Sequence, residues 1–260
     1  MGTEAASRMQ TSFAIRNVGL ERPEAPHVVW GHGWGQSGEA MLPLANSLAG
    51  FASSSVIDFP GFGSSPMPPA DWGTAEYADA VAAWIGEQPR RRRFWVGHSF
   101  GGRVGIQLAA RHPELLEGLV LIAAAGLPRT RSFPERVRFS LRRNGFKLAR
   151  RLLPEGPALE RLRSRMGSAD YRNAGPLRPI FIKVVNENLA DAAAKIQCRT
   201  LLLYGERDTE TPVEIGERLH ALIGNSQLVV LPGLDHNGIL GEGRHLTARH
   251  ILTFLKGEAQ

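Results

Sequence analysis

Short apolar runs alternate along the chain with longer amphipathic stretches. The apolar runs predict strands at residues 28–30, 54–57, 94–96, 119–122, 200–204 and 228–231, with an edge strand at residues 11–18. The amphipathic stretches predict helices at residues 39–48, 74–85, 103–111, 213–222 and 246–255. Fully apolar strands that alternate with helices are typical of parallel sheets covered on both faces. The pattern therefore predicts an α/β fold with a mostly parallel sheet.

One middle segment, residues 127–194, interrupts this alternation. It is rich in arginine and divided by prolines, and its spacing favours helices. One helical stripe is formed by Val137, Leu141, Leu148 and Leu152. An insertion that has an apolar face to bury is best explained as a helical cap over the strand ends. We therefore expect a core of residues 1–126 and 195–260, with a cap at residues 127–194.

Charge is distributed unevenly between the core and the predicted cap. The net charge of the whole chain is +6, but residues 129–183 hold 15 Lys plus Arg against 4 Asp plus Glu. The other residues carry 16 basic and 21 acidic side chains, a net charge of −5. The basic excess is expected to be a solvated helix face or, alternatively, a docking surface for an anionic partner. The run Arg90-Arg91-Arg92-Arg93 precedes a strand, away from the predicted site, and is expected to be solvated surface.

Composition excludes several classes of protein. A chain of 260 residues with 43% apolar residues can bury a full core. The single cysteine, Cys198, rules out an intramolecular disulfide and is expected to be a small buried hydrophobe. The sequence has no secretory-signal pattern and no apolar run as long as a membrane span, so we expect a cytoplasmic protein. No cofactor, metal or nucleic acid is expected to bind, because no motif for any of them is present.

The segment Gly97-His98-Ser99-Phe100-Gly101-Gly102 carries the clearest chemical signal. It lies between a predicted strand and a predicted helix, so the chain must turn sharply at Ser99. Only small residues fit two positions before and after such an apex, and glycine occupies both positions. This pattern predicts a nucleophile elbow, with the hydroxyl of Ser99 exposed at the end of a strand.

A serine nucleophile needs a base and a carboxylate that orients the base. His236 follows the last predicted strand and is the candidate base, while Asp208 follows the preceding strand and is the candidate carboxylate. Glu206 is the alternative carboxylate. Asp235 is expected to be a loop or supporting residue, and Asp58 a turn residue. The order Ser99, Asp208, His236 is the order found in the α/β-hydrolase arrangement.

The tetrahedral intermediate of acyl transfer needs hydrogen-bond donors for its oxyanion. The backbone N–H of Phe100 follows the nucleophile at a helix N-terminus and is one candidate. The backbone N–H of Trp34, in a glycine-rich loop after a strand, is the other. Alternatively, Trp34 is a core aromatic at a strand end. His32 and His98 are expected to pack and form hydrogen bonds locally.

Along nearly its whole length the chain resembles the α/β-hydrolase superfamily. The resemblance rests on His32-Gly33-Trp34-Gly35, Asp58-Phe59-Pro60-Gly61-Phe62-Gly63-Ser64-Ser65, Gly97-His98-Ser99-Phe100-Gly101-Gly102, Gly205-Glu206-Arg207-Asp208 and Asp235-His236. It implies a Ser-His-Asp hydrolase with a helical cap. The His-Gly-Trp-Gly loop is similar to that of the pimeloyl-carrier-protein methyl ester esterases. Serine at the apex argues against epoxide hydrolases and haloalkane dehalogenases, which use aspartate there.

We expect hydrolysis of a small-molecule carboxylic ester through an acyl-enzyme. Three alternatives remain open. In the first, the substrate is an ester or thioester on an acidic carrier that docks on the basic cap. In the second, the enzyme is a C–C bond hydrolase, although Asn237 replaces the tryptophan often found after the histidine in those enzymes. In the third, the chain is a ligand-binding protein with low turnover. A complete set of nucleophile, base and carboxylate argues against the last alternative.

Overall fold

The computed structural model describes residues 13–19, 22, 24–69, 72–129 and 169–257. Seven strands form one sheet in the order β1-β3-β2-β4-β5-β6-β7. They are β1 (Ala14–Val18), β2 (His27–Gly31), β3 (Ser53–Asp58), β4 (Arg93–His98), β5 (Gly118–Ile122), β6 (Arg199–Gly205) and β7 (Ser226–Leu231). Only β1 pairs antiparallel to its neighbour, β3, and the other pairs are parallel. This order confirms the predicted α/β-hydrolase fold with a mostly parallel sheet.

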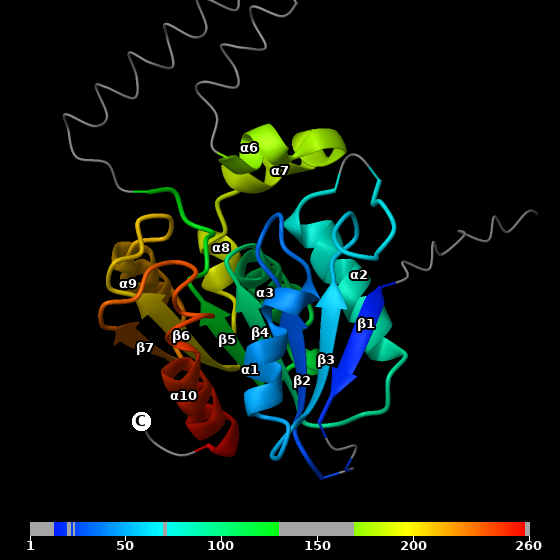
Figure 1. Cartoon of the computed structure of the whole chain (residues 1–260), viewed down its shortest axis with the longest axis vertical. Helices are drawn as coiled ribbons and strands as arrows, with labels where there is room; N and C mark the ends of the chain where they lie inside the picture. The colour runs from blue at the N-terminus through cyan, green and yellow to red at the C-terminus, as the bar shows by residue number, and fades with distance from the viewer. Residues whose placement is uncertain (1–12, 20–21, 23, 70–71, 130–168, 258–260) are drawn as a thin grey trace, which may run out of the picture.

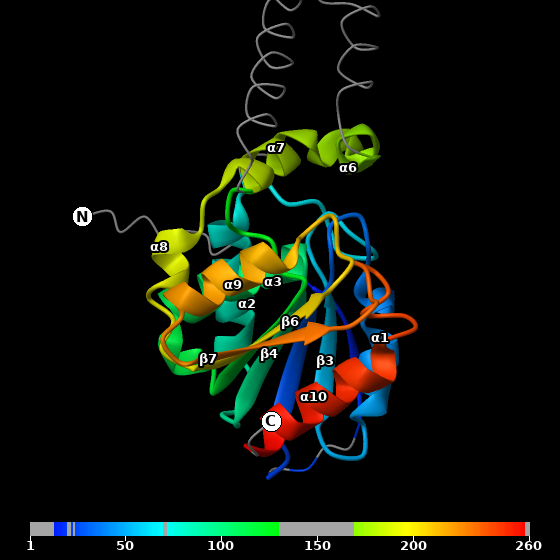
Figure 2. The ribbon, with the colours of Figure 1, turned by 90° about the vertical axis from the view of Figure 1, so that its left-hand side faces the viewer.

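Helices cover both faces of the sheet (Figures 1 and 2). The described helices are α1 (Leu42–Ser47), α2 (Thr74–Gly86), α3 (Phe100–Arg111), α6 (Ala169–Asn173), α7 (Arg178–Asn186), α8 (Ala190–Ala193), α9 (Val213–Leu222) and α10 (Arg244–Lys256). One face packs on α1 and α10, and the opposite face packs on α2, α3, α8 and α9. Two hydrophobic cores therefore lie on the two sides of the sheet.

The sequence of the central strands explains why both faces are buried. All six residues of β4 are buried. Side chains alternate across a strand, so Trp95 packs into one core while Phe94 and Val96 pack into the other. A strand between two cores is apolar through its centre, at residues 94–96 in β4, which is why these runs were visible in the sequence as continuous rather than alternating.

The structure corrects two expectations about the core. Residues 39–48 were expected to form one helix, but the chain forms a 3-10 turn at Gly38–Ala40 and then α1. Pro43 lies in the first turn of α1, where its missing N–H breaks no helical hydrogen bond, so it favours a new helix start. Arg93 was expected to be solvated but is buried, with its Nη2 donating to the carbonyl of Pro89 at 3.0 Å.

The described part of the predicted cap is helical. Helices α6 and α7 lie beyond the carboxyl ends of the parallel strands (Figure 2). Helix α8 instead packs against α3 and α9 on one side of the sheet. The apolar stripe predicted from Val137 to Leu152 lies outside the described residues. The division into core and cap therefore stays a prediction.

Candidate active site

Ser99 lies at the turn between β4 and α3 with a φ angle of 49°, a conformation that residues other than glycine rarely adopt. Its backbone N–H donates to the carbonyl of Ile122 at 3.0 Å. A Cβ on Gly97 would lie 2.2 Å from the carbonyl oxygen of Gly101, and one on Gly101 would lie 2.2 Å from that of Gly31. The tight packing at both glycines explains the small residues around the apex.

His236 and Asp208 form a buried pair in the loops after β7 and β6. The Nδ1 of His236 donates to Oδ2 of Asp208 at 2.7 Å. The other carboxylate oxygen accepts the backbone N–H groups of Glu210 and Thr211, each at 2.8 Å. Burial by itself raises the pKa of Asp208, but the hydrogen bonds from His236 and Thr211 outweigh it and lower the pKa. The carboxylate is therefore ionised and holds the imidazole with its proton on Nδ1.

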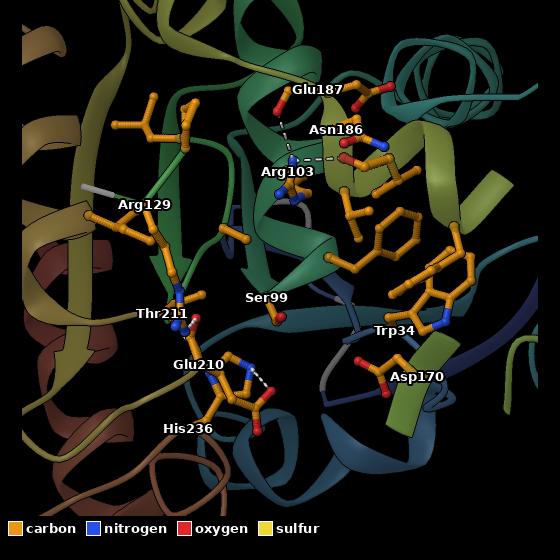
Figure 3. Close-up of a pocket in the computed structure, with 18 residues that line it drawn as sticks. Trp34, Ser99, Arg103, Arg129, Asp170, Asn186, Glu187, Glu210, Thr211 and His236 are labelled. Carbon is orange, nitrogen blue, oxygen red and sulfur yellow. Dashed lines mark hydrogen bonds and ion pairs between the residues drawn. The ribbon is translucent and has the colours of Figure 1, made fainter. Parts of the chain in front are cut away.

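Ser99 and His236 line the same pocket, which has a volume of about 790 Å³ (Figure 3). The Nε2 of His236 lies 3.8 Å from a carboxylate oxygen of Glu210, which also lines this pocket. Within the described residues, the Ser99 hydroxyl forms no hydrogen bond with His236. Catalytic hydrogen bonds are often longer without substrate and shorten in the complex, so this arrangement is compatible with proton transfer on substrate binding.

Thr211 was not predicted from the sequence. Its hydroxyl lies 2.7 Å from Oδ2 of Asp208, 3.1 Å from Nδ1 of His236 and 3.0 Å from the carbonyl oxygen of Ala123. It therefore links the pair to the end of β5. No motif marked this residue, because the contact depends on the loop path after Asp208 rather than on spacing.

The other carboxylates considered in the sequence have different roles. Glu206, the alternative to Asp208, is exposed and accepts the backbone N–H of Gly233. Asp235 accepts backbone N–H groups within its own loop, as expected. Asp58, expected in a turn, is instead the buried last residue of β3, and it accepts the backbone N–H of Gly38 at 2.6 Å and that of Ser64 at 2.9 Å.

The expectation of local hydrogen bonds is correct for one bond of His32, but it is wrong for His98, which bonds to a loop 138 residues away. The Nδ1 of His32 donates to the carbonyl of Gly33 at 2.7 Å, and its Nε2 accepts the backbone N–H of Phe59 at 3.0 Å. The Nε2 of His98 donates to the carbonyl of His236 at 3.1 Å. Burial lowers the pKa of His32 to about 4 and that of His98 to about 3. Both rings are therefore neutral at pH 7, and His98 supports the backbone of His236.

The two candidate oxyanion donors belong to residues that line the same pocket as Ser99. Phe100 is the first residue of α3, so its N–H has no partner inside that helix. Within the described residues, neither this N–H nor that of Trp34 donates a hydrogen bond. The Trp34 ring packs against Phe62, Phe100 and Phe181, with centroids 5.0 to 5.4 Å apart. Trp34 thus joins an aromatic cluster and also lines the pocket.

Two further observations concern partners outside the chain. No cluster of three His, Cys, Asp or Glu side chains that could hold a metal occurs in the part of the chain that the structure describes. Among the same residues, no helix has the length and apolar composition needed to span a bilayer.

Cys198 is half-buried rather than fully buried, and burial raises the pKa of its thiol to about 11.

Comparison with known proteins identifies the family. Residues 28–249 match the model of the alpha/beta hydrolase family. A pimeloyl-acyl-carrier-protein methyl ester esterase of Chromobacterium violaceum is 29% identical over 251 residues, 88% of this chain and 96% of the relative. The enzyme of the same name from Neisseria meningitidis serogroup C is 30% identical over 234 residues, 84% of this chain and 89% of the relative.

Solved structures agree with this assignment. A membrane phospholipase A described as a bacterial virulence factor superimposes with a TM-score of 0.72 at 28% identity, over 94% of this chain and 82% of that one. An esterase from Exiguobacterium antarcticum, at 21% identity, shares the fold with a TM-score of 0.71 over 95% of this chain and 96% of that one. The chain belongs to the alpha/beta hydrolase family. Within it, the chain is a carboxylic-ester hydrolase, as its sequence predicted.

Proposed function

We propose that Ser99, His236 and Asp208 form the catalytic triad of this esterase. Ser99 attacks the ester carbonyl while His236 takes its proton, and His236 then protonates the alcohol that leaves. Water next attacks the acyl-enzyme with His236 as base, which releases the acid and restores Ser99. The observation that carries this proposal is the 2.7 Å hydrogen bond from His236 to a buried carboxylate, with His236 facing the pocket that contains Ser99.

The oxyanion of each tetrahedral intermediate would accept the backbone N–H groups of Trp34 and Phe100. Trp34 and Phe100 line the same pocket as Ser99, and both N–H groups are without a partner among the described residues. The helix dipole of α3 adds partial positive charge at Phe100. Removal of one such donor typically lowers kcat by about 10²- to 10³-fold, so this pair would account for much of the catalysis.

We also infer that residues 127–194 act as a cap that bounds the acyl pocket. Helix α7 supports this role, because its side chains Phe181 and Val184 form part of the pocket wall. Leu127 contributes from the start of the same segment. These side chains are apolar, so they would contact the hydrocarbon part of an acyl chain.

The experiment that tests the triad compares wild type, Ser99→Ala and Asp235→Asn on p-nitrophenyl acetate, butyrate and octanoate. We expect wild-type turnover, a loss of several orders of magnitude in Ser99→Ala and near-normal turnover in the Asp235→Asn control. Equal turnover in Ser99→Ala would overturn the proposal. The ester that the wild type prefers would show how long an acyl chain the pocket accommodates.

A second candidate substrate is an acyl ester carried on an acidic carrier protein. It is favoured by the names of the relatives, which are methyl ester esterases of a carrier-bound acyl chain, and by the net charge of +11 in residues 129–183. Raising NaCl from about 50 mM to about 500 mM should then lower kcat/KM several-fold for the carrier-bound ester and leave a small neutral ester unaffected. An equal response of both substrates would exclude docking through charge.

A further inference from the structure

Arg103 is a buried cation in the wall of the pocket. It lies four residues beyond Ser99, one turn along α3, and both residues line the pocket. Only 8% of Arg103 is exposed. Burial lowers the pKa of its guanidinium to about 10, so the group is still charged at neutral pH. The site thus holds a fixed positive charge close to the nucleophile.

This charge has no carboxylate partner among the described residues. The Nη1 of Arg103 donates to the carbonyls of Val184 at 2.9 Å and Glu187 at 3.4 Å, at the end of α7. Its Nε and Nη2 donate to no described residue. The carboxylate of Glu187 attracts Arg103 through space but is bound to the backbone N–H and the hydroxyl of Thr74, at 3.0 and 2.5 Å. A buried charge without a bonded counter-ion is costly, which points to a ligand.

Charged side chains lie on more than one side of Ser99 in this pocket. Figure 3 shows Arg103 on one side of Ser99 and His236 and Glu210 on the other, with Asp170 apart from them beside Trp34. Glu187 lies next to Arg103, and Arg129 lies on the side of Thr211 and Glu210. In the proposed reaction, His236 protonates the leaving alcohol, so the alcohol lies on the side of His236. The acyl part then extends away from His236, toward the side of the pocket where Arg103 lies.

We propose that Arg103 binds a carboxylate on the acyl part of the substrate, so that the preferred esters are half-esters of dicarboxylic acids. This inference rests on the proposed function and narrows its substrate class. A planar guanidinium with donors on Nε and Nη2 matches the two oxygens of a carboxylate. An acyl chain joined to a carrier by a thioester lacks this carboxylate. The free half-ester is therefore the better substrate at this subsite.

The experiment measures kcat/KM for the monomethyl and dimethyl esters of the same dicarboxylic acids, from succinate to suberate. Without a positive charge, an apolar pocket disfavours the anionic half-ester. We expect the wild type to prefer the half-ester for at least one chain length. Arg103→Met should lower the ratio of half-ester to diester roughly 10- to 100-fold at that length, the range expected for loss of a charged hydrogen bond. Arg103→Lys should retain an intermediate ratio.

The matched control is Thr74→Val, which removes the hydroxyl bound to Glu187 and leaves Arg103 in place. It loosens the same end of α7, so it should lower kcat/KM for the half-ester and for the diester alike, without changing the ratio between them. A ratio that falls equally in Thr74→Val would show that Arg103 acts only by holding α7. A wild type that prefers the diester at every length would overturn the subsite. In both cases, continued hydrolysis of the diester would still support the proposed esterase function. Loss of all turnover of the wild type on neutral esters would contradict that function itself.

Discussion

Thr211 shows how a single hydroxyl can order the catalytic groups. Its oxygen lies within hydrogen-bond distance of Asp208, His236 and the carbonyl of Ala123. The hydroxyl has one proton to donate, to Asp208 or to Ala123, and its oxygen can accept a second, longer hydrogen bond from the N–H at Nδ1 of His236. It therefore favours the tautomer that leaves Nε2 free to act as base. Thr211 is a positioning residue, because it acts on the reaction through the pair that it contacts.

Replacement of Thr211 by valine should lower kcat on p-nitrophenyl butyrate by about tenfold, since a hydrogen bond to a charged group is lost. Thr211→Ser keeps the hydroxyl and should recover most of the rate. Steady-state kinetics of the two variants check this prediction. If the valine and serine variants are equally slow, the methyl group rather than the hydroxyl matters, and the positioning role is wrong.

The two buried neutral histidines predict a loss of stability in mild acid. The pKa of His32 is lowered to about 4 and that of His98 to about 3, below the ordinary value of 6.5, so the unfolded chain binds protons first as the pH falls. The contribution of each histidine to the free energy of unfolding is fully present above pH 6.5. It is lost progressively below that pH, until the pKa of the histidine in the folded chain is reached. At pH 5 the loss is about 2 kcal/mol for each histidine.

Urea unfolding at pH 7 and pH 5 measures this loss. His98→Asn should reduce the difference between the two pH values, although the variant is less stable at pH 7. His220→Gln is the control, because His220 is exposed, and it should keep the full difference. A wild type equally stable at both pH values would contradict the neutral state of the two rings.

At the scale of elements, the backbones of β4 and α3 approach each other closely at the site. Ser99 joins them directly, and the glycines on either side let the helix backbone approach the strand. This is why the strand, the turn and the helix were all recognisable in the sequence. Each local requirement, an apolar strand, a small residue and a helix start, agreed with the same fold.

Gly97→Ala should lower the free energy of unfolding by about 3 kcal/mol or more, because its Cβ would lie 2.2 Å from backbone. Gly86→Ala is the matched control. It lies at the end of α2 with no atom within 4 Å of its added Cβ, so it should be neutral or slightly stabilising. Thermal or urea unfolding distinguishes the two. Equal stability of both variants would contradict the close approach.

At the scale of the molecule, the sequence predicted the sheet, most helices and the candidate triad. Such patterns are local, or depend on the rule that strand ends meet at one edge of a parallel sheet. The sequence did not reveal Thr211, the burial of Arg93 or the unpaired charge of Arg103. Each of these depends on how distant loops and helices meet, and a charged residue looks the same in a sequence whether it is solvated or buried.

The interior of the pocket gives the enzyme its selectivity beyond the fold. Relatives with the same fold are named for different substrates, so specificity depends on the residues that line the pocket. In this chain, apolar side chains from α7, the buried Arg103 and the acidic groups near His236 divide the pocket into parts of different chemistry. The placement of the remaining cap residues and a cytoplasmic location stay predictions.

The most direct test of the central claim is to find which serine reacts. Wild type, Ser99→Ala and Asp208→Asn are treated with a fluorophosphonate, and peptides are mapped by mass spectrometry. The account predicts one label per chain on the peptide that contains Ser99, loss of esterase activity in step with labelling, slower labelling in Asp208→Asn and none in Ser99→Ala. A label on another residue, or esterase activity that survives full labelling of Ser99, would contradict the assignment of Ser99 as nucleophile.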